Sequence, residues 1–445
     1  MTDRQPTKAY NDHNVYILGA GFSVEAGLPV IKNFMNRMRD AAVWLEEQGD
    51  HALEAEAIAS VLQFRLSAAA AAYRVHLDIE NIEELFSLAS ASSVELAEDV
   101  TIAIAATLDY CRATAPEDGR RVCCVSKFDE SGWQSPSNWK PTGATNPWAD
   151  TPNHVSKWYD CPAYEFYVGL MCGYFSEQGS DRKNTVISLN YDTVVEDAMW
   201  GLNFPFRYAD NENVLWQKCS APDATKALLQ PVTILKLHGS VNVSAGARHW
   251  LGDEPVDEMK GKDLKELDNS VSACAYRTYR DLLRGNCRPT LVAPTWQKSM
   301  DGYLLKVWSE SVAALETATR IIIIGYSIPQ TDQHFRYLLA AGLQNNISLR
   351  KVLFVNPACG DTPEGREIER RLLGLFREEH HKQGIVEVIP TSMGEFLARP
   401  DGKIDEESDR QRIGRTLNPR KFRGTNFRNW TAQSGKGSVL SNMDF

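Results

Sequence analysis

A glycine-rich turn directly after a short apolar run is the feature that most constrains this chain. Residues 15–18 read Val-Tyr-Ile-Leu, a pattern typical of a buried strand, and Gly19-Ala20-Gly21-Phe22-Ser23 follows at once. Because glycine has no Cβ, the backbone at Gly19 and Gly21 can approach a pyrophosphate closely. Ser23 is placed to cap a short helix that would face the phosphate, before Gly27-Leu28-Pro29 ends it. A tight turn without a ligand is the alternative, since such motifs also match by chance.

The composition excludes several classes of protein. At 445 residues, 43% of them hydrophobic, the chain can bury a large core and is expected to hold two or three structural units. Its net charge of -10 disfavours binding of nucleic acid by the body of the protein. It has neither a run long enough to span a membrane nor an apolar signal-peptide core. Its 9 cysteines lack zinc-knuckle spacing. We therefore expect a cytoplasmic protein with reduced thiols and no metal site.

Short apolar runs recur along the chain, and most are followed by small or polar residues. After the first, they lie at residues 185–189, 232–237, 290–293, 320–324, 351–355 and 385–389. Nearly all-apolar strands are typical of a parallel sheet covered by helices on both faces. The sequence therefore predicts an α/β fold, a Rossmann-like doubly wound parallel sheet with a large helical insertion and a loop-rich segment. Ligands bind at the carboxyl edge of such sheets, so the glycine-rich turn, Asn190, His238, Ser327 and Asn356 should converge there.

The predicted sheet is interrupted twice and followed by a tail. We expect residues 1–32 and 161–400 to form the Rossmann-like domain, because the apolar runs lie within them. Residues 33–113, with apolar positions three and four apart, predict a helical insertion. Residues 114–160 form a loop-rich segment whose tryptophans either pack on the domain or meet a partner. In the tail, residues 401–445, basic and aromatic residues alternate, as in an arm that orders on a partner protein or nucleic acid, or in a solvated tail.

The order of these motifs resembles the sirtuin family. The shared pattern comprises the Gly-Ala-Gly-x-Ser turn, Asn-x-Asp after one strand, His-Gly after another, Gly-x-Ser at the end of a third and Asn after a fourth. The resemblance implies that NAD⁺ is bound by Gly19, Ala20, Gly21, Phe22, Ser23, Gly325, Ser327 and Asn356, the last two towards the adenosine half. It also implies that Asn190 and Asp192 flank the nicotinamide ribose, with His238 as the base beside it.

Departures from the family pattern indicate which group of sirtuin-like proteins the chain resembles. The chain lacks the paired-cysteine zinc motifs of protein-deacylating sirtuins, and Val30-Ile31-Lys32 replaces their Asp-Phe-Arg. It is instead similar to the bacterial sirtuin-like NADases of antiphage defence. That group often has Gly-Ala-Gly-Phe-Ser, a Pro-Thr-Trp-x-Lys turn, here residues 294–298, and Gly-Tyr-Ser-x-Pro-x-x-Asp, here residues 325–332. The resemblance favours NAD⁺ hydrolysis over deacylation. It implies a homo-oligomer with a separate partner, such as a HerA-like hexameric ATPase or, alternatively, a short Argonaute.

Hydrolysis of the nicotinamide–ribose bond needs few protein groups, because a neutral leaving group departs from a cation. Asn190 can orient the ribose, since a carboxamide both donates and accepts hydrogen bonds. His238 can take a proton from water, because imidazole titrates near neutral pH. Asp192 either orients one of them or caps the helix that begins at Val194. A deacylase, an ADP-ribosyltransferase and a non-catalytic sensor of NAD⁺ or ADP-ribose remain the alternatives.

Overall fold

The computed structural model describes the greater part of residues 12–393. The described ranges are 12–48, 51–72, 74, 78–115, 121–125, 156–160, 162–172, 183–201, 204–209, 231–245, 273–275, 278–284, 287–292, 302–328 and 332–393. The tail at 401–445, most of the tryptophan-containing segment and the turn at 294–298 lie outside these ranges. The predictions made for those segments therefore stay predictions.

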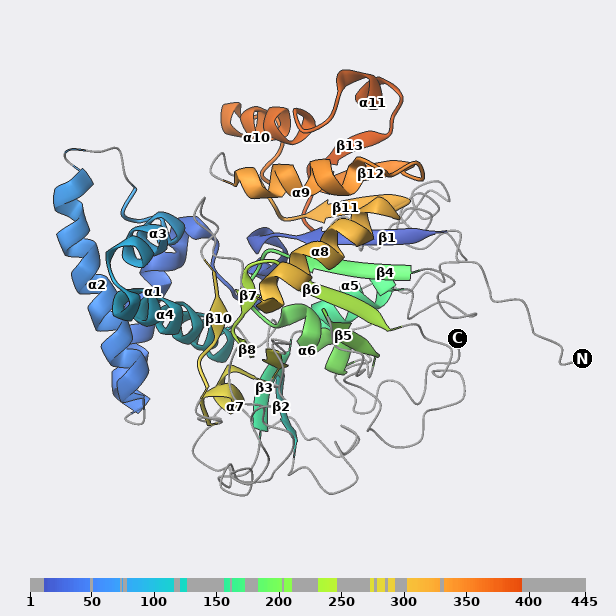
Figure 1. Ribbon diagram of the computed structural model, residues 1–445. Coiled ribbons are helices and arrows are strands. Elements are labelled where there is room, and N and C mark those ends of the chain that lie inside the picture. Colours follow the sequence, from blue (N-terminus) through green and yellow to red (C-terminus); the bar gives the residue numbers. More distant parts are fainter. Residues whose placement is uncertain are drawn as a thin grey trace, which may run out of the picture.

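A seven-stranded parallel sheet forms the centre of the described structure (Figure 1). Its strands are β1 (His13–Leu18), β4 (Lys183–Ser188), β5 (Phe206–Tyr208), β6 (Val232–Lys236), β11 (Arg320–Ile324), β12 (Lys351–Val355) and β13 (Val386–Ile389). They lie in the order β13-β12-β11-β1-β4-β6-β5, with every neighbouring pair parallel. Strands β4, β5 and β6 lie on one side of β1, with β5 at the edge, and β11, β12 and β13 follow one another on the other side, so the order reverses between β1 and β11. The predicted Rossmann-like doubly wound class is confirmed.

Two features of the sheet differ from the sequence-based expectation. The run at 290–293 is not a strand of the main sheet, because β10 (Thr290–Leu291) pairs antiparallel with β7 (Gly239–Ser240). This pairing is only two residues long on each side and follows the carboxyl end of β6. The sequence also missed β5, a three-residue edge strand whose central residue, Arg207, is charged. Two further antiparallel pairs join β2 (Arg121–Val125) to β3 (Ser156–Asp160) and β8 (Val243–Ala245) to β9 (Ala273–Ala275).

Four helices pack together beside the sheet, in the segment predicted as a helical insertion (Figure 1, blue). They are α1 (Ile31–Gln48), α2 (Ala52–Ala72), α3 (Ile82–Ser92) and α4 (Val94–Ala113). Helix α3 has Glu83 and Glu84 in its first turn, and its cap Asn81 accepts from the Glu83 amide at 2.9 Å. Arg112 of α4 donates to the carbonyl oxygen of Ala26 at 2.9 Å, so this group touches the end of the glycine-rich turn. The exact domain boundaries stay a prediction.

The remaining helices lie between strands along the chain. They are α5 (Pro162–Cys172), α6 (Val194–Gly201), α7 (Tyr279–Arg284), α8 (Gly302–Glu316), α9 (Gln333–Leu343), α10 (Pro363–Leu373) and α11 (Glu378–Lys382). Helices α5 and α6 pack on each other, as do α8 and α9. The Tyr16 hydroxyl donates to the Met171 carbonyl at 2.8 Å, which ties β1 to α5. Within the described residues, no helix combines the length and apolar character needed to cross a bilayer.

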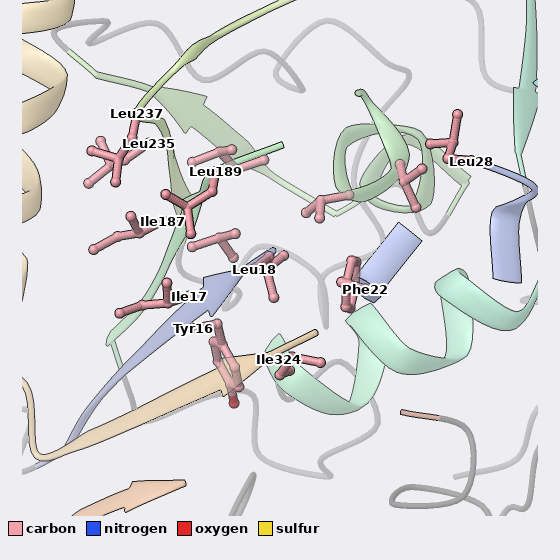
Figure 2. Close-up of a cluster of buried hydrophobic side chains, with 14 of the residues drawn as sticks. Tyr16, Ile17, Leu18, Phe22, Leu28, Ile187, Leu189, Leu235, Leu237 and Ile324 are labelled. Carbon is pink, nitrogen blue, oxygen red and sulfur yellow. The ribbon is translucent and has the colours of Figure 1, made fainter. Parts of the chain in front are cut away.

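The hydrophobic core is built from the central strands and extends into the glycine-rich turn. Figure 2 shows Tyr16, Ile17 and Leu18 of β1 among apolar residues of β4, β6 and β11. Phe22 belongs to the same core and meets Tyr164 of α5 edge to face, with ring centroids 5.1 Å apart. Full burial of a phenylalanine contributes about 1.5–3 kcal/mol. The turn is therefore anchored to the core by one of its own side chains.

Candidate functional site at the carboxyl edge of the sheet

The glycine-rich turn is locked onto the end of β11 by backbone contacts. It follows β1 as η1 (Ala20–Ala26), a 3-10 helix that ends at Gly27, whose φ of 85° is left-handed. The amide of Gly19 donates to Ile324 at 2.9 Å, and that of Gly21 to Gly325 at 2.8 Å. A Cβ on Gly19 would lie 2.5 Å from the Cβ of Tyr326. The glycines are thus required by the close approach of two strand ends at the point where the strand order reverses.

This geometry corrects two details of the sequence interpretation. The amides of Gly19 and Gly21, expected to face a phosphate, already donate to carbonyls at and just beyond the end of β11, and that of Phe22 donates to the Gly19 carbonyl at 2.9 Å. Ser23 is not a helix cap, because the helical turn begins at Ala20, with Gly19 in the capping position. Ser23 lies inside η1, where its buried hydroxyl oxygen accepts a hydrogen bond from the side chain of Asn190.

Asn190 joins the end of β4 to the glycine-rich turn. Its Nδ2 donates to the Gly19 carbonyl oxygen and to the Ser23 Oγ, both at 3.0 Å. Its backbone amide donates to Ser188 Oγ at 3.2 Å. The side chain is 8% exposed, and its Oδ1 accepts no hydrogen bond from the described part of the chain. Both amide hydrogens are therefore committed to the protein, while Oδ1 can accept a hydrogen bond from a ligand hydroxyl.

His238 lies two residues beyond β6 and is oriented by the backbone next to Asn190. Its Nδ1 lies 3.1 Å from the carbonyl oxygen of Leu189, and the Tyr191 ring is tilted beside it at 6.3 Å between centroids. A carbonyl oxygen only accepts, so Nδ1 carries the hydrogen and the neutral ring has its lone pair on Nε2. The structure thus places the His238 ring against the backbone next to Asn190. That the two side chains act in one site stays a prediction.

Asp192 contacts the start of α6. Its Oδ1 accepts from the amide of Val194 at 3.0 Å, which is the capping alternative considered from the sequence. Its backbone carbonyl accepts from the ammonium group of Lys236. Side chains of this kind satisfy amides that a helix start leaves without a partner. A further contact of Asp192 with a ribose stays a prediction.

The residues assigned to the adenosine half lie at the ends of β11 and β12. Gly325 has a φ of 64°, and a Cβ on it would lie 2.2 Å from the Phe22 nitrogen. Asn356 donates to the Tyr326 carbonyl oxygen at 3.3 Å and accepts from the Ala358 amide at 2.9 Å. Ser327 is half-buried between these segments. Gly325, Ser327 and Asn356 are therefore grouped on the β11 side of the turn, and Asn190 and His238 on the β4 side.

A buried polar network on the segment that follows Asn190 was not predicted from the sequence. The ammonium group of Lys236 lies 3.3 Å from Glu196 Oε1, which also accepts from the Tyr208 hydroxyl at 3.1 Å. Asn242 in turn donates to the Tyr208 oxygen at 3.1 Å. Burial raises the pKa of the Glu196 carboxyl, and the charge of Lys236 opposes that rise. A lone lysine inside an apolar run was the available signal, because a fully buried lysine needs a partner.

Cysteine, histidine and carboxylate side chains do not gather into a possible metal site within the described ranges, where groups of three or more were sought. His13 is a buried histidine in β1, far in sequence from His238. Its ring nitrogens lie 2.9 Å from Thr317 Oγ1 and 2.9 Å from Thr185 Oγ1. These hydroxyl contacts account for its burial without a ligand.

Comparison with known proteins gives likenesses to solved structures alone. No family model matches the sequence. No curated protein matches it either.

Several solved structures are similar to this chain. One is a Sir2 chain in complex with the inhibitor EX-527, 2'-O-acetyl-ADP-ribose and deacetylated p53 peptide. It has 12% identity and a TM-score of 0.27, and the match covers 84% of this chain and 94% of that chain. A Sir2–p53 peptide–NAD⁺ structure has 12% identity and a TM-score of 0.26, covering 81% and 92%. A third, described as showing the structural basis for the mechanism and regulation of Sir2 enzymes, has 11% identity and a TM-score of 0.30, covering 82% and 92%.

Proposed function

We propose that this chain is an NAD⁺ glycohydrolase, which cleaves the nicotinamide–ribose bond to give nicotinamide and ADP-ribose. The observation that carries the proposal is that Asn190 bonds to the glycine-rich turn while His238 bonds to the carbonyl next to Asn190, beside the reversal of strand order. Doubly wound folds bind dinucleotides at this position. The order of sirtuin-like motifs supports NAD⁺ as the dinucleotide.

The two sides of the turn suggest how NAD⁺ would lie. Ser327 and Asn356 would face its adenosine half, and Asn190 and His238 its nicotinamide ribose. Because the amides of Gly19, Gly21 and Phe22 donate to the protein, the Ala20 amide would be the donor of this turn to the pyrophosphate. Asn190 Oδ1 would accept a hydrogen bond from a ribose hydroxyl and so orient the sugar.

The proposed chemistry is a substitution at the ribose carbon. The bond from C1' to the nicotinamide nitrogen breaks, and its electron pair leaves with nicotinamide. A water oxygen forms the new bond to C1', and His238 Nε2 takes the proton that this water loses. The orientation of His238 by Leu189 supports this role, because it fixes Nε2 as the basic nitrogen.

Sequence features favour hydrolysis in a defence setting over deacylation. The chain lacks paired-cysteine zinc motifs, and its Gly-Ala-Gly-Phe-Ser turn and residues 325–332 resemble antiphage NADases. We therefore infer an effector that depletes cellular NAD⁺ in abortive infection. By the same resemblance it acts in the cytoplasm as an oligomer, with a HerA-like ATPase as the preferred partner and a short Argonaute as the alternative.

Product analysis in water enriched in oxygen-18 tests the proposal. The full chain is incubated with NAD⁺, alone and with the product of its genomic neighbour. Hydrolysis predicts equal amounts of nicotinamide and ADP-ribose, the latter carrying one oxygen-18 atom. Modified protein or acyl-ADP-ribose would instead indicate a transferase or a deacylase. Tight NAD⁺ binding without products under both conditions would indicate a sensor.

A further inference from the structure

Lys236 is a fully buried cation on the segment that carries His238. It is 1% exposed, as is its partner Glu196 in α6. Replacing a buried ion pair by apolar side chains of similar size is often neutral or even stabilising. Stability alone therefore does not explain why a buried lysine ends the apolar strand β6.

The hydrogen bonds of Lys236 indicate what the pair does. Its ammonium group donates to the backbone carbonyl of Asp192, while Glu196 Oε1 lies 3.3 Å away as its counter-ion. The preceding carbonyl, that of Tyr191, accepts from the Val241 amide at 2.9 Å and from Ser240 Oγ at 3.2 Å. In the turn that begins with Asn190, the Asp192 carbonyl is therefore bonded to a residue before His238 and the Tyr191 carbonyl to residues after it.

We propose that Lys236 is a positioning residue, which holds Asn190 in register with His238 through the carbonyl of Asp192. This inference rests on the proposed NAD⁺ hydrolysis, because it assigns those two side chains to the same reaction. Lys236 donates to the Asp192 carbonyl from a strand of the main sheet, whereas Ser240 and Val241 donate to the Tyr191 carbonyl from the segment after His238. A misplacement of about 1 Å costs on the order of 100-fold in rate.

A double variant separates positioning from stability. Lys236→Met alone leaves Glu196 buried without its counter-ion, so the test uses Lys236→Met with Glu196→Gln, which removes both charges and keeps an acceptor for Tyr208. We expect a melting temperature close to that of the wild type, a kcat lower by about 100-fold, and a KM for NAD⁺ changed by less than about threefold. A double variant with both the melting temperature and the kcat of the wild type would overturn the proposal, because the ion pair would then have no role in positioning.

A second lysine offers a matched control. Lys351 of β12 also donates to a backbone carbonyl, that of Gly384 at 2.9 Å, and pairs with Glu387 at 2.8 Å. It lies at the amino end of its strand, away from Asn190 and His238. The double variant Lys351→Met with Glu387→Gln should therefore leave kcat unchanged. An equal loss of kcat in this control would contradict a role specific to Lys236.

Hydrogen exchange tests the contact without relying on turnover. Peptides that cover residues 189–197 should exchange on the order of tenfold faster in the Lys236 and Glu196 double variant, and at the wild-type rate in the control. Unchanged exchange in both would overturn the positioning role whatever the activity. Faster exchange combined with a wild type that never cleaves NAD⁺ would instead refute the proposed function and leave the structural role of Lys236 in place.

Discussion

The two ends of the parallel sheet both bury polar side chains, but they bond them differently. At the amino end, His13 bonds to the hydroxyls of Thr317 and Thr185, and Asn14 to the side chain of Asn184. At the carboxyl end, Asn190, His238 and Lys236 reach backbone carbonyls of neighbouring turns. At the amino end these side chains bond mainly to one another, although Asn184 also donates to the Cys172 carbonyl at 3.3 Å. At the carboxyl end all three side chains reach carbonyls of neighbouring turns and so fix the path of those turns. Burial of a polar residue is therefore weaker evidence for a site than the identity of its partner.

The largest expected effect on stability concerns the close approach at the carboxyl end. Gly325→Ala places a Cβ 2.2 Å from the Phe22 nitrogen at a φ of 64°. We expect a loss of about 3–5 kcal/mol in the free energy of unfolding, from overpacking and left-handed strain together. Chemical denaturation followed by circular dichroism measures it.

Gly384→Ala is the matched control for that substitution. Its φ is 68°, and nothing lies within 4 Å of the added Cβ. Strain alone should cost about 1 kcal/mol. Equal losses at Gly325 and Gly384 would show that Gly325 and Phe22 do not lie in close contact.

At the amino end of the sheet, His13 should make the free energy of unfolding depend on pH. Burial, helped by the charge of Lys183, lowers the pKa of His13 from 6.5 to about 3. The folded state therefore binds fewer protons than the unfolded state below pH 6.5, so this residue makes stability fall as the pH drops. Between pH 6.5 and about 4.5 we expect His13 to account for a loss of about 2 kcal/mol.

The measurement is the difference in pH dependence between the wild type and His13→Gln, obtained from urea unfolding at several pH values. Other titrating groups contribute to both proteins and cancel in the difference. Parallel curves for the two proteins would mean that His13 is not held neutral by its surroundings.

The smallest expected effect concerns the contact between Ser23 and Asn190. Ser23→Ala leaves one hydrogen of Asn190 Nδ2 without its acceptor, which should cost about 1–2 kcal/mol. Ser311→Ala is the control, because that hydroxyl only donates to the Val307 carbonyl of its own helix at 2.7 Å. A change below about 0.5 kcal/mol is expected there, because a serine bond to the carbonyl four residues back does not stabilise a helix and alanine is the better helix former. The two values should differ in thermal unfolding, and similar values would argue against the contact.

The sheet and the position of its edge could be predicted because all-apolar strands and the residues that follow them are local patterns. Asn190 and His238 were predicted to converge on the same grounds. The role of Gly325 as a contact for the glycine-rich turn could not be predicted, because it depends on a backbone more than 300 residues distant in sequence. Lys236 was visible as a charge in an apolar run, but its partners Asp192 and Glu196 lie on the preceding strand–helix unit. The error at 290–293 arose because a short apolar run does not reveal its pairing partner.

Release of nicotinamide from NAD⁺ by two histidine variants tests the central claim most directly. His238→Ala and His13→Gln are compared with the wild type under conditions in which the wild type turns over, with rates expressed per folded molecule. We predict a loss of about 100- to 10,000-fold for His238→Ala, the usual contribution of a general base, and no more than about a twofold change for His13→Gln. Undiminished turnover in His238→Ala, or an equal loss in both variants, would contradict the account.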